Sequence, residues 1–120
     1  MFNRRQQYGR QGEAMAARFL KKQGYVILCR NYRARTGEID IIAKDGDALV
    51  FIEVKSRHTD SYGSAKASIT RAKQAKITRT AMYYLKETRQ AEASARFDVV
   101  ILGGEGEHIE VIRNAFEAAL

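Results

Sequence analysis

The stretch Leu49-Val50-Phe51-Ile52-Glu53-Val54-Lys55-Ser56 decides the fold class of this chain. It is rich in β-branched and aromatic residues, so it predicts a strand over residues 49–56. Side chains alternate along a strand, which places Glu53 and Lys55 on one face and Val50, Ile52 and Val54 on the other. Unpaired charges on a buried sheet face are costly, so this pair needs a partner, solvent or a function.

A hairpin is predicted just before this strand. The β-rich run at residues 38–43 leads to Asp45-Gly46, which is a strong short-range hairpin signal. With the two-residue turn at Asp45-Gly46, Asp40 is expected on the same face as Glu53 and diagonal to it, at about 7 to 8 Å between backbone positions. Both carboxylates would then reach one ion. Strand alternation turns Glu38 toward the face of Asp40, where it is either a ligand or supporting carboxylate, or simply exposed at the start of the strand.

The remaining pattern predicts a mixed sheet flanked by helices. Helical spacing of apolar residues predicts helices over residues 8–23 and 64–87, and β-rich runs predict strands at 25–30, 97–102 and 109–112. Asn114 is expected to cap a short C-terminal helix. The order αβββαββα indicates an α/β fold of the α+β sandwich type. With 120 residues and no proline to mark a linker, one domain over residues 1–120 is expected.

Glu13 is a third candidate carboxylate for the same site. Glu13 lies on the apolar face of the first predicted helix, where it should face the sheet. Alternatively, Glu13 simply begins that helix, because a negative charge is favourable near the N-terminal end of the helix dipole. Oxygen ligands such as Asp40, Glu53 and Glu13 suit Mg²⁺ or Mn²⁺, which bind phosphate oxygens and lower the pKa of water. Lys55 is expected to orient that water or to stabilise charge on phosphorus.

The charge of the chain suits a polyanionic partner. The formal net charge is +7, and residues 61–86 contain basic residues but no Asp or Glu. Candidate nucleic-acid-binding residues are Arg33, Arg57, Lys73, Lys76 and Arg79. The alternative is an ordinary solvated helix face and loop. No apolar run approaches the length of a membrane span or a signal peptide, so we expect a cytoplasmic protein without a membrane partner.

Six motifs make the chain similar to a known family. It resembles the bacterial YraN family at Gly12-Glu13, Asn31-Tyr32-Arg33, Gly37-Glu38-Ile39-Asp40, Phe51-Ile52-Glu53-Val54-Lys55-Ser56-Arg57, Arg96-Phe97-Asp98-Val99 and Asn114-Ala115-Phe116. These motifs span almost the whole chain. That family is similar to the PD-(D/E)xK endonuclease superfamily and close in architecture to archaeal Holliday-junction resolvases. The resemblance therefore implies a restriction-endonuclease-like core.

The resemblance also implies roles for particular residues. Asp40 matches the first half of the PD-(D/E)xK motif, Glu53 and Lys55 match the second half, and Glu13 matches the glutamate of the first helix. Ile39 stands in place of the motif's proline, which removes no ligand. The implied activity is divalent-metal-dependent hydrolysis of nucleic acid, DNA in preference to RNA, with branched or recombination intermediates as substrates.

Two other readings stay open from the sequence. The chain would also suit a non-catalytic module that keeps a nuclease fold to bind nucleic acid or a protein partner, although its intact acidic cluster argues against this. It would also suit a structural subunit of a larger repair assembly. Two cuts across a junction would need a symmetric homodimer.

Overall fold

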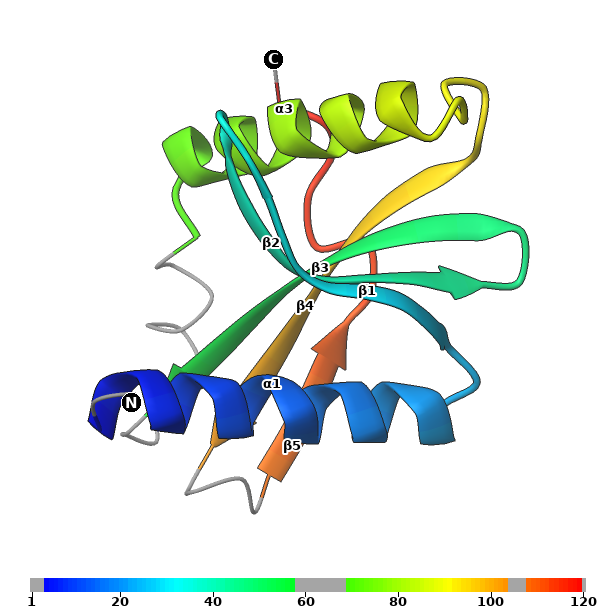
Figure 1. The fold of residues 1–120 in the computed structure, drawn as a ribbon. Helices are drawn as coiled ribbons and strands as arrows, with labels where there is room; N and C mark the ends of the chain where they lie inside the picture. The colour runs from blue at the N-terminus through cyan, green and yellow to red at the C-terminus, as the bar shows by residue number, and fades with distance from the viewer. Residues whose placement is uncertain (1–3, 58–68, 104–107, 120) are drawn as a thin grey trace.

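A five-stranded sheet lies between two long helices in the computed structural model of the chain (Figure 1). The structure describes residues 4–57, 69–103 and 108–119. Its elements are α1 (Arg4–Lys22), β1 (Val26–Ala34), β2 (Gly37–Asp45), β3 (Ala48–Arg57), α3 (Arg71–Glu87), β4 (Ala95–Gly103) and β5 (His108–Ile112). The sheet order is β1-β2-β3-β4-β5, with β3 and β4 parallel and the other neighbours antiparallel. The predicted mixed sheet flanked by helices is confirmed.

Each helix covers a different face of the sheet. Leu20 of α1 packs in a buried cluster with Ile52 of β3. Ile77 of α3 packs in another cluster with Phe51, the next residue along the same strand. Because neighbouring strand residues point to opposite faces, α1 and α3 lie on opposite sides of the sheet. The two layers of apolar contact hold the strands that carry the predicted site.

The β2–β3 hairpin differs from the predicted register by two residues. Asp45 pairs with Ala48, so the two turn residues are Gly46 and Asp47. Gly46 has a φ of 62°, and glycine is favoured at the first position of a tight hairpin turn because it adopts positive φ without strain. Phe51 consequently pairs with Ile42, whereas the predicted register paired Phe51 with Asp40. The predicted turn at Asp45-Gly46 was wrong.

β2 and β3 separate at Asp40. Their pairing ends at Ile41 and Ile52, although β2 begins at Gly37 and β3 continues to Arg57. Ile39 and Ile41 pack in clusters on opposite faces, whereas residues two apart on a regular strand share a face. The backbone of β2 therefore changes face at Asp40, and the tip of the β1–β2 hairpin reaches α3 while the end of β3 approaches α1 (Figure 1).

The boundaries of one helix and one strand also differ from the prediction. α3 begins at Arg71, with Thr70 as its N-cap accepting a hydrogen bond of 3.2 Å from the Lys73 backbone N–H. The earlier part of the predicted helix, residues 64–68, lies outside the described residues. In addition, β1 extends to Ala34, four residues beyond the predicted strand, because it pairs with β2 as far as Gly37.

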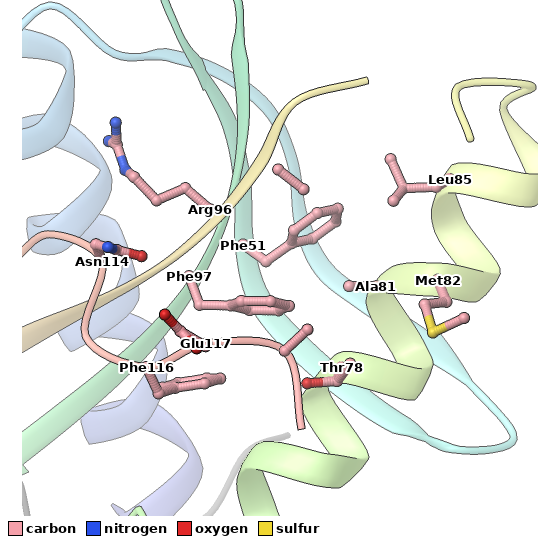
Figure 2. A pocket seen from close by; sticks show the side chains of 12 residues that line it. Phe51, Thr78, Ala81, Met82, Leu85, Arg96, Phe97, Asn114, Phe116 and Glu117 are labelled. Carbon is pink, nitrogen blue, oxygen red and sulfur yellow. The ribbon is translucent and has the colours of Figure 1, made fainter. Parts of the chain in front are cut away.

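The C-terminal helix predicted from Asn114 was wrong, because residues 113–119 form turns and irregular structure. Asn114 has a φ of 51°, and its backbone N–H donates to Asp98 Oδ1 at 2.9 Å. The Phe116 ring stacks on Phe97 with 4.9 Å between ring centroids, beside a cavity of about 260 Å³ (Figure 2). The Ala119 N–H donates to Thr78 Oγ1 of α3 at 3.0 Å. These tertiary contacts outweigh the weak propensity of a short isolated helix.

Candidate functional site

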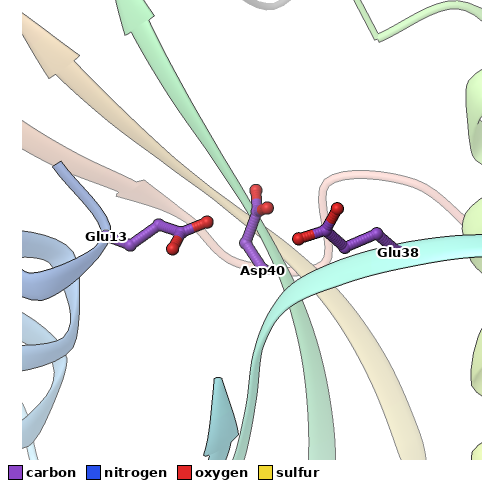
Figure 3. Close-up of side chains that lie close together, drawn as sticks. All are labelled: Glu13, Glu38 and Asp40. Atoms are coloured by element: carbon purple, nitrogen blue, oxygen red, sulfur yellow. The ribbon is translucent and has the colours of Figure 1, made fainter. Parts of the chain in front are cut away.

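Three carboxylates converge where β2 and β3 separate. Glu13, Glu38 and Asp40 each place an oxygen within 4.8 Å of the other two. Figure 3 shows Asp40 between Glu13, which comes from α1, and Glu38, which comes from the start of β2. Because β2 and β3 diverge here, Glu13 can approach Asp40 from the α1 side of the sheet, beside the edge of β3.

The Asp40 carboxylate is held in an environment that disfavours its charge. Its Oδ2 accepts a hydrogen bond of 2.8 Å from the backbone N–H of Val54. Burial raises the pKa of Asp40 from 3.8 to about 8, with the charges of Glu53 and Glu13 acting in the same direction and the Val54 hydrogen bond opposing them. A carboxylate in this position gains from any nearby positive charge.

A positive charge that interacts with Asp40 belongs to a second pair on β3. Lys55 Nζ lies 3.3 Å from Glu53 Oε1, and both side chains are largely buried. Burial acts to lower the pKa of Lys55, but a hydrogen bond with Lys73 and the charges of Glu53 and Asp40 outweigh it, so the pKa is raised. That hydrogen bond, together with burial and the charge of Lys55, lowers the pKa of Lys73. Lys73 on α3 therefore stands beside Lys55, on the opposite side of the sheet from α1.

Gly12 allows α1 to approach the sheet closely. A Cβ built at this position would lie 3.0 Å from Leu102 Cδ1 and 3.7 Å from Ser56 Oγ. Those contacts leave no free room for a larger side chain, so glycine sets the height of the helix above β3 and β4. Because Glu13 is the next residue, this close approach places its carboxylate beside Asp40.

The donor atoms of the carboxylate cluster fit a hard divalent cation. All three are carboxylate oxygens, the ligand type that Mg²⁺ and Mn²⁺ prefer. Oxygens bound at about 2.1 Å in octahedral geometry lie about 3 to 4 Å apart, and three oxygens within 4.8 Å of one another can reach that spacing by small side-chain shifts. The raised pKa of Asp40 likewise indicates that an added positive charge would stabilise its ionised form.

The structure groups the predicted ligands differently from the sequence. It brings Glu13 and Asp40 together as expected, but their third neighbour is Glu38, while Glu53 lies close by in its pair with Lys55. Glu38 is exposed and lies 3.7 Å from Arg33, so it is the most weakly held of the carboxylates. Strand alternation offered a signal for Glu38, since it placed that residue on the face of Asp40.

The predicted basic residues lie on two elements. Lys73, Lys76 and Arg79 are exposed on α3, and Arg33 is exposed on β1. Arg57 ends β3 and pairs with Gly103, and its side chain lies outside the described part of the chain. α3 therefore presents several positive charges that begin beside the carboxylates.

Asp98 is a buried charge to which the sequence assigned no role. Its carboxylate is fully buried and accepts hydrogen bonds from Tyr25 Oη at 2.7 Å, Arg96 Nε at 2.9 Å and the Asn114 N–H. Arg96 also pairs with Asp45 at 2.8 Å, and its pKa is raised by these partners, with Asp98 contributing most. Every strong interaction of Asp98 is thus internal. It anchors the C-terminal segment and is not part of the carboxylate cluster.

Two further features bear on the site. The cavity beside Phe116 includes none of the carboxylate cluster or Lys55 among its described lining residues, so it is separate from the site. Neither α1 nor α3, the helices of the described residues, is long and apolar enough to cross a membrane.

Comparison with known proteins identifies the family. The model of the "Uncharacterised protein family UPF0102" matches residues 12–102, which include all four predicted catalytic residues. A UPF0102 protein of Desulfosudis oleivorans is 65% identical over 120 residues, covering 100% of this chain and 98% of the relative. One of Syntrophus aciditrophicus is 50% identical over 113 residues (92% and 89%), and one of Geobacter metallireducens is 45% identical over 113 residues (92% and 93%). The chain therefore belongs to the UPF0102 family, the YraN family that its motifs resemble.

Proposed function

We propose that the protein is a divalent-metal-dependent endonuclease that hydrolyses phosphodiester bonds in nucleic acid, DNA in preference to RNA. One observation carries the proposal. The partly buried Asp40 carboxylate lies between two other carboxylates and beside the Glu53–Lys55 pair, at the point where β2 leaves β3. Such a cluster lowers the stability of the metal-free fold, so it is better explained by a bound cation than by a structural role.

The cation would be held by Asp40 and Glu13, with Glu53 or Glu38 as a further ligand. When bound, Mg²⁺ or Mn²⁺ would supply charge neutralisation for the phosphate oxygens and a lower pKa for the attacking water. Lys55, kept charged by Glu53 at 3.3 Å, would stabilise the added negative charge on phosphorus in the transition state. Lys73 would support that role because its hydrogen bond with Lys55 raises the pKa of Lys55 and so favours the charged form of Lys55.

The reaction is a simple hydrolysis. The oxygen of a water molecule attacks phosphorus, one P–O bond of the strand breaks, and the proton lost by the water balances the one gained by the leaving oxygen. In this scheme Asp40 and Glu13 would hold the cation that binds the scissile phosphate, and Lys55 would act on the non-bridging oxygens of that phosphate. Branched or recombination intermediates are the proposed substrates, and symmetric cutting of a junction would need two copies of the chain.

The test is a cleavage assay with the purified full chain. Labelled single-stranded, duplex, flap and four-way-junction DNA, with single-stranded RNA for comparison, would be incubated with Mg²⁺, Mn²⁺ or EDTA. We expect metal-dependent cutting by the wild type and a loss of at least about 100-fold in Lys55→Ala. Asp40→Asn and Glu53→Gln should also lose cleavage while still binding DNA.

Matched controls come from the same hairpin. Lys44 and Asp47 are exposed and outside the carboxylate cluster, so Lys44→Ala and Asp47→Asn should cut like the wild type. Cutting that persists in EDTA or in Asp40→Asn would refute the proposal and indicate a contaminating nuclease. Intact DNA binding with no cutting of any substrate would favour the non-catalytic binding module instead.

A further inference from the structure

A stripe of exposed residues runs along α3 away from the candidate site. Its members recur at three- and four-residue spacing, which places them on one side of the helix: Lys73, Lys76, Arg79, Tyr83 and Lys86. The stripe begins at Lys73, which stands beside Lys55. Ten residues separate Lys73 from Tyr83, or about 15 Å along the helix axis. The stripe thus links the site to a more distant part of the surface.

The far part of the stripe is hollowed into a groove of about 390 Å³. The groove is lined by Thr36, Arg79, Met82, Tyr83, Leu85, Lys86 and Ala91. Met82 and Tyr83 are 49% and 54% exposed, so their apolar surface is open to solvent within the groove. Two of the described lining residues are basic and none is acidic. The groove therefore combines apolar and aromatic surface with positive charge.

The tip of the β1–β2 hairpin closes one side of this groove. Thr36 Oγ1 lies 2.7 Å from Thr80 Oγ1 of α3, so a hydrogen bond pins the tip to the helix. A Cβ at Gly37 would lie 3.4 Å from the same Thr80 oxygen, which shows how closely the two elements pack. Arg33 and Arg35 are exposed on the same hairpin, whose second strand carries Asp40. The β1–β2 hairpin therefore connects the groove, at its tip, to the candidate site, at Asp40.

We propose that this groove binds an unpaired, single-stranded segment of nucleic acid that continues from the scissile phosphate. A base would stack on Tyr83 and Met82, while Arg79 and Lys86 would contact the adjacent phosphates and Lys76 those nearer the site. This inference rests on the proposed nuclease function and specifies its substrate as nucleic acid with a single-stranded region beside the cut.

The chemistry of the groove favours this occupant over others. Aromatic side chains in a positive groove are the usual means of binding single strands, because every unpaired base offers a flat apolar face. A duplex buries those faces in its own stack and would use only the charges. A second copy of the chain would bring another +7 of net charge against a basic groove, which opposes self-association there.

The test measures binding apart from cleavage. Fluorescence anisotropy in EDTA would compare a single-stranded oligonucleotide, a blunt duplex and a duplex with a single-stranded overhang. Loss of one stacked base should weaken single-strand and overhang binding by about tenfold in Tyr83→Ala, since base stacking on an aromatic contributes about 1 to 3 kcal/mol. Blunt-duplex affinity should not change. Tyr83→Phe keeps the ring and should bind like the wild type.

Matched controls separate stacking from general effects. Leu28 is 44% exposed on β1, outside the groove, so Leu28→Ala removes a comparable apolar side chain and should leave binding unchanged. Lys22 is exposed at the end of α1, so Lys22→Ala is the single-charge control for Arg79→Ala, which should weaken binding to single strands. A 2-aminopurine in the overhang should be quenched by the wild type and by Tyr83→Phe but not by Tyr83→Ala.

The outcomes distinguish this inference from the proposed function. Equal single-strand affinity of the wild type and Tyr83→Ala would overturn the inference, even if the protein cuts DNA. Tyr83-dependent binding by a protein that cuts no substrate with Mg²⁺ or Mn²⁺ would support the groove and refute the nuclease. A dimer in sedimentation that Tyr83→Ala dissociates, with no effect on oligonucleotide binding, would assign the groove to a second copy and overturn the inference.

Discussion

Replacing Asp40 with asparagine should make the metal-free protein more stable while abolishing its activity. Asparagine has the same shape, and its side-chain oxygen can still accept the 2.8 Å hydrogen bond from the Val54 N–H. The substitution removes only the charge, which burial, Glu53 and Glu13 all disfavour. If the Asp40 carboxylate stabilised the fold, its replacement by asparagine would instead lower the free energy of unfolding.

The size of the effect follows from the pKa of Asp40, which burial and its acidic neighbours raise from 3.8 to about 8. Each pH unit between those values corresponds to about 1.4 kcal/mol, which sets a ceiling of about 6 kcal/mol. Water penetration and small movements of the carboxylates reduce this, because the effective dielectric constant near such groups is about 20. We expect a gain of about 2 kcal/mol, or about 8 °C in Tm.

The gain should depend on pH in a defined direction. The folded protein keeps the Asp40 proton to a higher pH than the unfolded chain does, so wild-type stability is lost as the pH rises between about 4 and about 8. The asparagine that replaces Asp40 in the variant does not titrate. The difference in unfolding free energy should therefore be near zero at pH 4 and complete above pH 8.

The assay is thermal and urea unfolding followed by circular dichroism in EDTA from pH 4 to 9. In a separate titration without EDTA, Mn²⁺ at about 100 times its Kd should stabilise the wild type by about 2.7 kcal/mol and the variant much less. Asp45→Asn is the matched control on β2, and it should lose stability because Asp45 accepts a 2.8 Å hydrogen bond from Arg96. A destabilised Asp40→Asn, or a gain that does not vary with pH, would refute the reasoning.

Three further substitutions test other parts of the structure. Asp98→Ala should lower the free energy of unfolding by about 3 kcal/mol in urea titrations, because it leaves the Arg96 and Tyr25 groups without their buried acceptor; no loss would contradict an anchoring role. Gly12→Ala should lower the free energy of unfolding by about 1 kcal/mol, because its Cβ would meet Leu102 Cδ1 at 3.0 Å. The same contact would lift Glu13 away from Asp40, so Mn²⁺ binding measured by calorimetry should weaken. Unchanged Mn²⁺ affinity would argue against Glu13 as a ligand. Lys76→Ala should weaken DNA binding and reduce the slope of log K against log[salt] by about one, whereas Lys22→Ala should not.

Local sequence patterns were sufficient for the strand that carries Glu53 and Lys55. Alternation along a strand is a property of the backbone, so the two residues were expected as neighbours on one face, and they form an ion pair at 3.3 Å. The predicted helices and strands were likewise found, apart from the C-terminal helix and shifts at element ends. Glu13 was expected to face the sheet from the first helix, and it does.

Longer-range geometry could not be read from the same patterns. Asp45-Gly46 and Gly46-Asp47 are both acceptable turns, and the choice between them shifts the hairpin by two residues. The Asn114 helix failed because its backbone N–H is bound by Asp98, sixteen residues earlier in the chain. Nothing within a few residues of Asn114 signals that contact.

The sequence by itself determined the element types, the basic character of α3 and which residues carry ionisable groups, because these depend on composition and on local backbone periodicity. Only the tertiary structure decided how the groups meet. β2 changes face at Asp40 since its tip is held to α3 through Thr36 and Thr80, while Gly12 brings α1 down onto the other face. That break in the strand, enforced by packing between distant segments, joins Glu38 to Glu13 and Asp40 and leaves Glu53 with Lys55.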